Sequence, residues 1–505
     1  MKKQRLILSL ASALLFPSGA FAASQETAIT IYSKAQPGAV DPDLYRPING
    51  NGMNVPGYAV VRQMRTVAIP EKSSILKFSD VAALIDPTTV QFKSLTDPKG
   101  TKVTEQDYQF DLVSQEKLLE KYIDKKISVE KSTGGKIEIV EGTLMSTQGG
   151  LTLKMADGSI KAVNGYSSIS FPDLPGGLIT KPTLVWNVMA DKTGEHKTEV
   201  SYQTQGITWW ADYNLIYKEG KDANSGTVDF GSWVSIINQT GATFSDAKLK
   251  LMAGDVQQVD SNAYSKSEAR AMRVVEAPAP TPSFAKKSFF EYHLYTLNRP
   301  VTLPNNFTKQ MDFIPAAAGV PVEKIMVYTG VSNEYLNGGG EYYNDGNYGL
   351  ESGNKKVDVY LKLVNKEENG LGVPLPSGRI RVNQRDDDGS LEFIGESLID
   401  HTPRNEELLV KLGSAFDVVG ERKQINYTLD TARKYADEKI EIKIRNQKKQ
   451  SMKVKVIESM YRATNWEIKN SNEEYKKDNA NQVSYLISIA PEEEKVIHYT
   501  VRYKW

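Results

Sequence analysis

The sequence contains no cysteine, and this absence excludes several kinds of chemistry at once. A chain without thiols forms no disulfide, has no thiol nucleophile and offers no thiolate ligand to a metal. It also lacks the cysteine to which a lipid is attached at the start of a mature lipoprotein. We therefore expect its stability to rest on the burial of apolar side chains.

Catalytic signatures are scarce as well. The four histidines lie far apart in the sequence, without the paired spacing of a zinc protease: His196, His293, His401 and His498. There is no G-x-S-x-G elbow, no phosphate-binding loop and no dinucleotide fingerprint. We predict no catalytic residue, no metal site and no cofactor, and we lean towards a protein that is not an enzyme.

The first 22 residues have the pattern of a signal peptide. Basic residues up to Arg5 precede an apolar run from Leu6 to Phe16, and Ala20 and Ala22 are small residues where a signal peptidase reads the chain. The run is too short to be a finished membrane anchor. The mature chain is therefore expected in the periplasm or outside the cell, and this style of signal fits a bacterial source.

The charge balance argues against two kinds of partner. Basic and acidic residues both number 62, and removal of residues 1–22, which hold three basic and no acidic residues, leaves 59 against 62. Nucleic acids and anionic membrane surfaces favour a clustered basic excess. No later stretch approaches the roughly 18 consecutive apolar residues of a membrane-spanning helix. We expect neither a nucleic-acid partner nor an integral membrane anchor.

Apolar residues alternate with polar ones in most readable segments. Examples are residues 136–139, 151–155, 356–363, 442–444, 452–456 and 499–505. This period of two indicates half-buried strands, which are typical of antiparallel sheets. The fold class predicted is mainly β, with multidomain antiparallel β-sandwich (Ig-like) modules, a small SH3-like barrel and one short helix.

That helix is expected from Gln115 to Lys126, with Ser114 as its N-cap. At about 150 residues per domain, a chain of this length predicts about three domains. The predicted division is a signal peptide at 1–22, an N-terminal β domain ending in the helix at 23–126, a small β-barrel at 127–180, the first part of a C-terminal β-sandwich region at 181–259, an exposed Pro/Ala-rich linker at 260–288, and the second part of that region at 289–505.

A segment rich in glycine, asparagine and tyrosine runs from Tyr335 to Asn354. Glycine and asparagine oppose burial, whereas exposed tyrosine rings favour contact with a partner. We predict a loop here and take Tyr342, Tyr343 and Tyr348 as the candidate binding residues.

Two other motifs have competing interpretations. Asp386 to Gly389 could wrap a calcium ion, but the ligand spacing of a calcium loop fails, and Asp-Gly favours a hairpin turn between strands 380–383 and 391–394. Trp209 and Trp210 could form an aromatic platform for a glycan. On a strand they point to opposite faces, so we expect one in the core, the other partly exposed, and at most one in any given patch.

Several short motifs occur in one order and resemble a known family. They are residues 206–213, 249–256, 291–296, 370–378 and 393–396, together with Leu303, Lys309, Gln310, Asn446 and Trp466, and upstream Arg65, Ile69-Pro70 and Ile85 to Pro87. This set resembles an exported bacterial family with a C-terminal domain of unknown function, number 4139, of which mucoidy-inhibitor-A-like proteins are distant relatives. The resemblance implies export and a β-sandwich architecture, and no established reaction.

The functional hypothesis is an exported, non-catalytic binding or scaffolding protein of the bacterial cell envelope. Its partner would be a glycan, an envelope component or another protein. One alternative is a hydrolase of envelope polymers that uses Asp212, Asp255 and Glu396. Another is an outer-membrane β-barrel, because the chain ends on an alternating aromatic strand.

Overall fold

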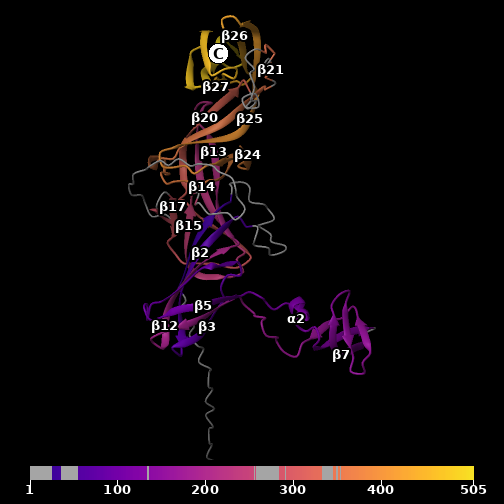
Figure 1. Cartoon of the computed structure of the whole chain (residues 1–505). Helices are drawn as coiled ribbons and strands as arrows, with labels where there is room; N and C mark the ends of the chain where they lie inside the picture. Colours follow the sequence, from indigo (N-terminus) through magenta and orange to yellow (C-terminus); the bar gives the residue numbers. More distant parts are fainter. Residues whose placement is uncertain are drawn as a thin grey trace, which may run out of the picture. The chain divides into compact units, whose positions relative to one another are not determined.

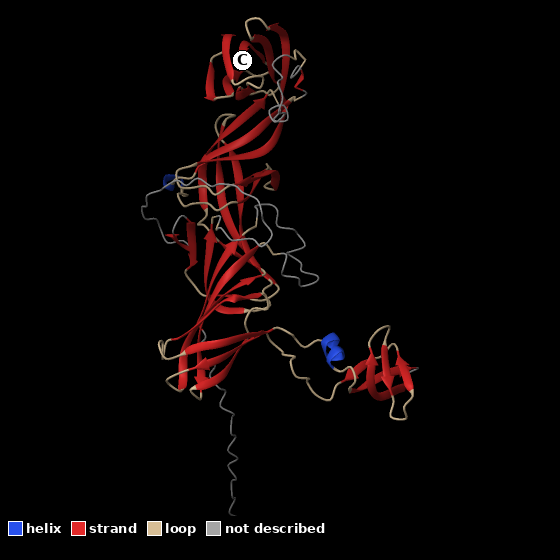
Figure 2. Cartoon of the chain, in the orientation of Figure 1, coloured by secondary structure: helices blue, strands red, loops and turns tan. Residues whose placement is uncertain are grey.

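The computed structural model describes residues 26–35, 55–133, 136–254, 256, 284–289, 292–331, 345–347, 351–352 and 354–505 (Figure 1). Within these residues, strands make up nearly all of the regular structure, with one α-helix and a short 3-10 helix at Glu367–Asn369 (Figure 2). The prediction of a mainly β protein with several antiparallel sheets is confirmed. Among the described residues, no helix is long and apolar enough to cross a membrane.

The chain divides into two compact units. The first comprises Met1–Ala28 and Val60–Gln203, and the second comprises Ile29–Ala59 and Thr204–Trp505. The second unit therefore takes in a short N-terminal piece of the chain as well as its whole C-terminal part.

The first unit is built around a buried tryptophan. Trp186 lies on the central strand of a three-stranded antiparallel sheet ordered β3-β11-β5, and its ring contacts Phe78 and Phe92 at 5.3 and 5.0 Å between centroids. Its indole N–H donates to Gln106. The strands of this unit outside the small module are β2 (Gly57–Ile69, from Val60 onward), β3 (Ser73–Ser79), β4 (Ile85–Ser94), β5 (Lys102–Gln109), β11 (Thr183–Met189) and β12 (Gly194–Gln205).

A small module within the first unit contains the helix α2 (Gln115–Lys121). The Ser114 side chain accepts a hydrogen bond from the Lys117 N–H, which satisfies one of the free donors at the helix start and confirms the predicted cap. The helix ends earlier than predicted, because Tyr122 already leaves the helical conformation. Five strands complete the module: β6 (Lys126–Thr133), β7 (Lys136–Ser146), β8 (Leu151–Lys154), β9 (Ile160–Val163) and β10 (Ser168–Ser170).

These five strands form one antiparallel sheet in the order β10-β6-β7-β8-β9. Leu119 and Tyr122 pack against alternating strand residues such as Val129 and Leu153 to form its core. Among the described residues no ladder joins β9 to β10, so the sheet does not close into the SH3-like barrel that the sequence predicted.

The second unit contains a long, mostly antiparallel sheet ordered β24-β23-β13-β14-β20-β22-β25-β26-β31-β28. The strand β13 is central to the site described below; it pairs antiparallel with β14 along its whole length and parallel with β23 from Ala211 onward. The strands are β13 (Ile207–Glu219), β14 (Ser225–Asn238), β19 (Phe307–Asp312), β20 (Ala317–Thr329), β21 (Glu351–Ser352), β22 (Lys356–Val364), β23 (Gly378–Arg385), β24 (Leu391–Ile399), β25 (Glu407–Asp430), β26 (Tyr435–Asn446), β27 (Met452–Ser459), β28 (Asn465–Ser471), β29 (Tyr475–Asn479), β30 (Gln482–Ile489) and β31 (Glu494–Lys504).

The same unit holds β1 (Glu26–Ser33, from Ile29 onward), β15 (Phe244–Ala253), β16 (Phe284–Phe289), β17 (Tyr292–Leu297) and β18 (Val301–Leu303). The strands β16 and β17 form an antiparallel pair, so the last residues of the range predicted as linker lie in a strand. Residues 257–283 lie outside the described residues.

Alternating apolar residues form the core at the C-terminal end of the second unit, where β27 and β30 pack with β26 and β31. Ile442, Ile444, Val454 and Val501 are among the fully buried side chains, which confirms the pattern predicted for these segments. Trp505 does not follow this pattern of burial, because its side chain is 37% exposed.

The predicted hairpin is also confirmed. The strands β23 and β24 pair antiparallel, and the turn between them is closed by the backbone N–H of Gly389 donating to the Asp386 carbonyl. The Asp388 carboxylate accepts from the backbone of Ser390, and its pKa is lowered by hydrogen bonds from the Ser390 hydroxyl and N–H. Asp386 and Asp388 therefore stabilise the turn through these hydrogen bonds.

Candidate functional site

The predicted binding residues Tyr342, Tyr343 and Tyr348 lie outside the described residues, so their role stays a prediction. The described piece of the same segment, residues 345–347, is held by one buried and one half-buried side chain of the second unit. Arg462 Nη1 donates to the Asp345 carbonyl over 2.7 Å, and Gln424 Nε2 donates to the Gly346 carbonyl over 2.9 Å.

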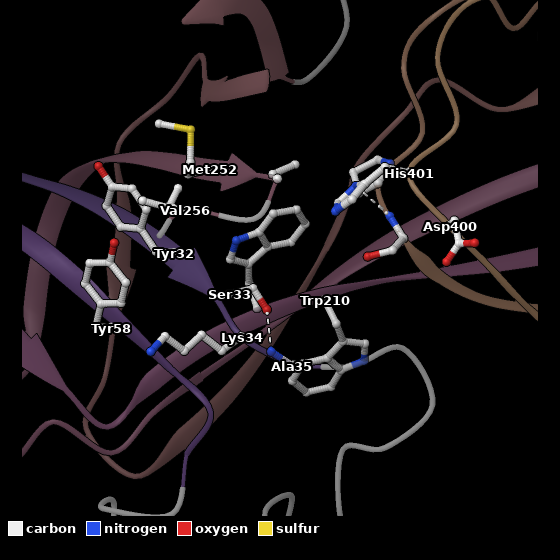
Figure 3. A pocket seen from close by; sticks show the side chains of 15 residues that line it. Tyr32, Ser33, Lys34, Ala35, Tyr58, Trp210, Met252, Val256, Asp400 and His401 are labelled. Carbon is white, nitrogen blue, oxygen red and sulfur yellow. Dashed lines mark hydrogen bonds between the residues drawn. The ribbon is translucent and has the colours of Figure 1, made fainter. Parts of the chain in front are cut away.

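The candidate site is an open pocket in the second unit with a volume of about 380 Å³. Figure 3 places Tyr32 and Tyr58 on one side of it and Asp400 and His401 on the opposite side. The lining residues come from segments far apart in the sequence. They are Tyr32 to Ala35, Tyr58, Trp209, Trp210, Met252 to Gly254, Val256, Pro376, Ser377, Asp400 and His401.

Two stacked tyrosines form the first wall. The rings of Tyr32 and Tyr58 are 4.6 Å apart between centroids and nearly parallel, at 3°. Gly57 permits this approach, since a Cβ there would lie 2.7 Å from the carbonyl oxygens of Tyr32 and Ile207. Burial raises the pKa of Tyr58 to about 12, with Tyr32 adding to the shift, so the hydroxyl stays neutral and can both donate and accept.

A polar chain fixes the end of β1 beside this wall. Ser33 Oγ lies 3.2 Å from Thr208 Oγ1, which in turn donates to the Pro56 carbonyl over 2.7 Å. The same carbonyl accepts from the Lys34 N–H, and Ser33 Oγ accepts from the Ala35 N–H. The backbone that carries Lys34 to the rim of the pocket is therefore held on both sides.

The opposite wall consists of two loops, and buried tyrosines fasten the one that carries Pro376 and Ser377. Tyr213 and Tyr295 each donate their hydroxyl over 2.8 Å, to the carbonyls of Pro376 and Pro374 respectively. The Ser377 N–H donates to His401 Nδ1 over 3.1 Å. Because Nδ1 accepts, a neutral His401 ring carries its proton on Nε2. The contact uses the backbone of Ser377, so it orients the imidazole without activating the hydroxyl.

The two tryptophans correct a prediction. Trp209 and Trp210 are both buried, at 2% and 6% exposed, and both line the pocket. Trp210 is buried because Val55, Ile237 and the partly buried Ala35 pack on it. The strand β23 pairs with β13 only from Ala211 onward, so it does not cover the edge of β13 beside the two tryptophans. Both side chains can therefore reach one pocket.

The hydrolase hypothesis named three carboxylates. Asp255 lies outside the described residues. Asp212 and Glu396 converge on one arginine, with Arg381 Nη1 3.2 Å from Asp212 Oδ1 and Arg381 Nε 3.6 Å from Glu396 Oε2. Asp212 Oδ2 also accepts from the Trp210 indole over 2.7 Å. The guanidinium thus lies between the two carboxylates and pairs with each.

His401 is the one histidine among the lining residues of this pocket. His196 is buried in the first unit and shares a hydrogen bond with Ser94, while His293 and His498 lie on β17 and β31. Among the described residues no group of three or more His, Asp or Glu side chains could hold a metal ion. The pocket offers a ligand aromatic rings, hydroxyls, the Lys34 ammonium group, the His401 imidazole and the Asp400 carboxylate.

Sequence reasoning missed this pocket. Tyr32, Lys34 and Tyr58 occur in ordinary strand patterns, and His401 carries no motif. The segments 206–213, 249–256 and 370–378 were singled out as motifs, but nothing in the sequence joined them into one site; the last contains Pro374 and Pro376, whose carbonyls fasten the loop. The signal that could have pointed here is its run of glycines and prolines, which favours a fixed loop over a strand.

A family model described as a domain of unknown function, DUF4139, matches residues 198–505, which is more than half of the chain. No curated protein matches the chain significantly, and neither does any solved structure.

Proposed function

Since the chain belongs to the DUF4139 family, whose description assigns no function, we propose a function from the pocket: non-catalytic binding or scaffolding in a bacterial cell envelope, after export. The observation that carries this is the open pocket of about 380 Å³, walled by aromatic rings and loops that are each fastened by hydrogen bonds. Concave sites with apolar walls and a few placed polar groups are typical of ligand binding.

The chemistry of the walls indicates the kind of ligand. The stacked Tyr32 and Tyr58 offer an apolar surface with neutral hydroxyls at its edge. Lys34 is exposed at the rim and can attract an anionic or strongly polar group. A ligand with a flat apolar part and polar substituents, such as a glycan or a side chain of a partner protein, matches this surface.

Two features favour binding over catalysis. A serine nucleophile needs its hydroxyl within hydrogen-bond reach of a base, yet His401 accepts from the backbone of Ser377, and Ser33 Oγ contacts Thr208. A carboxylate pair needs room for substrate and water between its members, whereas Arg381 pairs with both Asp212 and Glu396. These arrangements suit a fixed binding surface.

Export and an envelope location are supported by the N-terminal sequence alone. The basic start, the apolar run from Leu6 to Phe16 and the small residues Ala20 and Ala22 fit a cleaved signal peptide. We place the mature protein, from Ala23 onward, in the periplasm or outside the cell.

The test is affinity capture from an envelope extract by the mature chain, residues 23–505, with the captured material identified by mass spectrometry. The pocket variant combines Lys34→Glu with Ser377→Leu, which reverses the rim charge and fills space. The matched control is Lys449→Glu, an exposed lysine in the turn after β26. We expect the parent and the control to retain one partner that the pocket variant loses by about tenfold or more. Equal retention by all three would refute the pocket as the binding site.

A further inference from the structure

Another tryptophan of the second unit, Trp233, lies outside the tyrosine-walled pocket. Trp233 is 46% exposed although it lies inside the sheet, where β14 pairs with β13 on one edge and with β19 on the other. Its partners across these ladders are Asp212 and Asp312. An indole in water forgoes the roughly 25 cal/mol per Å² that burial of its apolar area would contribute. The ring is therefore presented on an open sheet face.

Space is left beside this ring by a glycine. Gly231 lies two residues before Trp233 on the same strand, so it shares the outward face, and it pairs with Asn214. A Cβ on Gly231 would meet nothing closer than the Asn214 carbonyl, at 3.7 Å. Glycine weakens a strand interior and often marks a place where a ligand approaches closely. Here it leaves an open floor next to the indole.

Planar polar side chains surround this floor. A shallow pocket of about 190 Å³ is lined by Trp233, Asp212, Asn214, Gln310 and Arg381, which we call the Trp233 platform. They come from four adjacent strands, β13, β14, β19 and β23. Gln310 is oriented by donating to Ser235 Oγ over 3.0 Å, and Asp212 is oriented by Trp210 and Arg381.

We propose that the Trp233 platform binds a neutral oligosaccharide. The C–H face of a sugar ring is apolar and packs flat on an exposed indole, which has a large rigid apolar face. Its ring hydroxyls both donate and accept, and amide, carboxylate and guanidinium groups in fixed positions complement them. Aromatic and planar polar groups meet in this way on the open face of one sheet.

The local charge selects a neutral sugar over an acidic one. Two carboxylates, Asp212 in the platform and Glu396 beside it, flank the guanidinium of Arg381, so its positive charge is already paired. An acidic sugar would bring a further negative charge beside them, which is unfavourable. This site is separate from the tyrosine-walled pocket, although Trp210 lines that pocket and donates to Asp212 of the platform.

The experiment measures equilibrium binding of soluble cello-, chito- and mannohexaose, with an oligomer of a uronic acid as the acidic probe, to the mature chain by calorimetry. The blocking variant is Gly231→Val, which fills the floor with a residue that strands favour. Trp233→Ala removes the stacking surface. The control is Trp505→Ala, which removes another exposed tryptophan, 37% exposed, at the chain end.

We expect at least one neutral hexaose to bind, and both platform variants to weaken its binding by about tenfold or more while Trp505→Ala does not. Gly231→Val should keep or raise the melting temperature, which separates blocking from misfolding. Lys34→Glu, in the tyrosine-walled pocket, should leave hexaose binding to the platform unchanged. The two proposed sites can therefore be refuted independently. Binding of the acidic oligomer alone, binding unaffected by a folded Gly231→Val, or no binding of any neutral hexaose would overturn the proposal.

Discussion

At the scale of single residues, the C-terminal end of the second unit contains two ion pairs buried beyond the reach of water. Arg422 Nε lies 2.9 Å from Glu458 Oε2, with both side chains at most 1% exposed. Arg462 Nη2 lies 3.2 Å from Glu438 Oε1, with both at 0%. Burial opposes the charge on Arg422, but Glu458, together with Tyr499, Tyr461 and Glu438, outweighs this effect and holds the pKa of Arg422 above its usual value.

Removing one member of such a pair is expected to be costly. Glu458→Gln leaves the Arg422 guanidinium buried without its counter-charge, which typically costs about 3–5 kcal/mol. Chemical unfolding of the mature chain at pH 7 measures this loss. The double variant Glu458→Leu with Arg422→Met should lose much less, because neither charge remains to be desolvated. A single variant as stable as the parent would contradict this account.

The tryptophans show what sequence can predict about one residue. The alternation of side chains along a strand correctly predicted that Trp209 and Trp210 point to opposite faces of β13. Trp210 shares a face with Asp212, to which its indole N–H donates. Exposure was predicted wrongly, because the residues that bury Trp210, such as Val55 and Ala35, precede it by more than 150 positions in the chain. The local pattern predicts to which face of the strand a side chain points, whereas its burial depends on segments that are distant in the sequence.

At the scale of elements, one carboxylate joins three strands of the second unit. Asp229 on β14 lies 2.7 Å from Lys218 Nζ on β13 and accepts from the backbone N–H of Gly319 on β20. The hydrogen bond from Lys218, followed by the one from Gly319, lowers the pKa of Asp229 from 3.8. The ionised form is therefore favoured in the folded state.

This shift predicts a pH dependence of defined sign. Because the pKa is lower in the folded state, Asp229 contributes stability above its unfolded pKa of 3.8, and this contribution is lost as the pH falls through the folded value. Asp229→Asn should therefore lower the melting temperature at pH 7, by the equivalent of less than about 1 kcal/mol because the pair is partly exposed.

The measurement is a series of melting temperatures from pH 7 to acid, with Asp387→Asn in the exposed β23–β24 turn as the control. The gap between the parent and Asp229→Asn should narrow below pH 3.8. A difference in melting temperature that stays constant or grows as the pH falls would show that the ionised Asp229 carboxylate is not the source of the stability.

Elements with complete local signals were predicted well, except that the helix ends at Lys121 and not at the predicted Lys126. The helix needed a cap and an apolar stripe, both within Ser114 to Ile123, and the β23–β24 hairpin needed its Asp-Gly turn. The length of β25, 24 residues, was not predicted, because its apolar alternation is interrupted and its course depends on pairing with both β22 and β26.

At the scale of the whole molecule, the pocket could not be predicted, since its walls come from residues 32–35, 58, 209–210, 252–254, 256, 376–377 and 400–401. Three of these pieces lie in segments recognised as motifs, but only the fold of the second unit joins them into one site. The tyrosine segment was predicted from composition, which cannot reveal that Arg462 and Gln424 donate to its Asp345 and Gly346 carbonyls.

Those two contacts determine how the tyrosine prediction should be tested. Deleting the segment would remove the Asp345 carbonyl that accepts from Arg462 Nη1, so we expect a lower melting temperature and an ambiguous loss of binding. Replacing Tyr342, Tyr343 and Tyr348 together by serine keeps the Asp345 carbonyl. Capture from envelope extract by this triple variant should fall if the tyrosines contribute to binding, and capture equal to the parent would exclude them.

The most direct test of the central claim is co-sedimentation of the mature chain with insoluble envelope material, with soluble reducing ends and free amino groups assayed in the same tubes. The account predicts that the chain sediments with the material saturably, that Lys34→Glu with Ser377→Leu reduces this, and that no soluble product accumulates over the no-protein control. Steady release of product, abolished by Asp212→Asn or Glu396→Gln, would contradict it and identify a hydrolase.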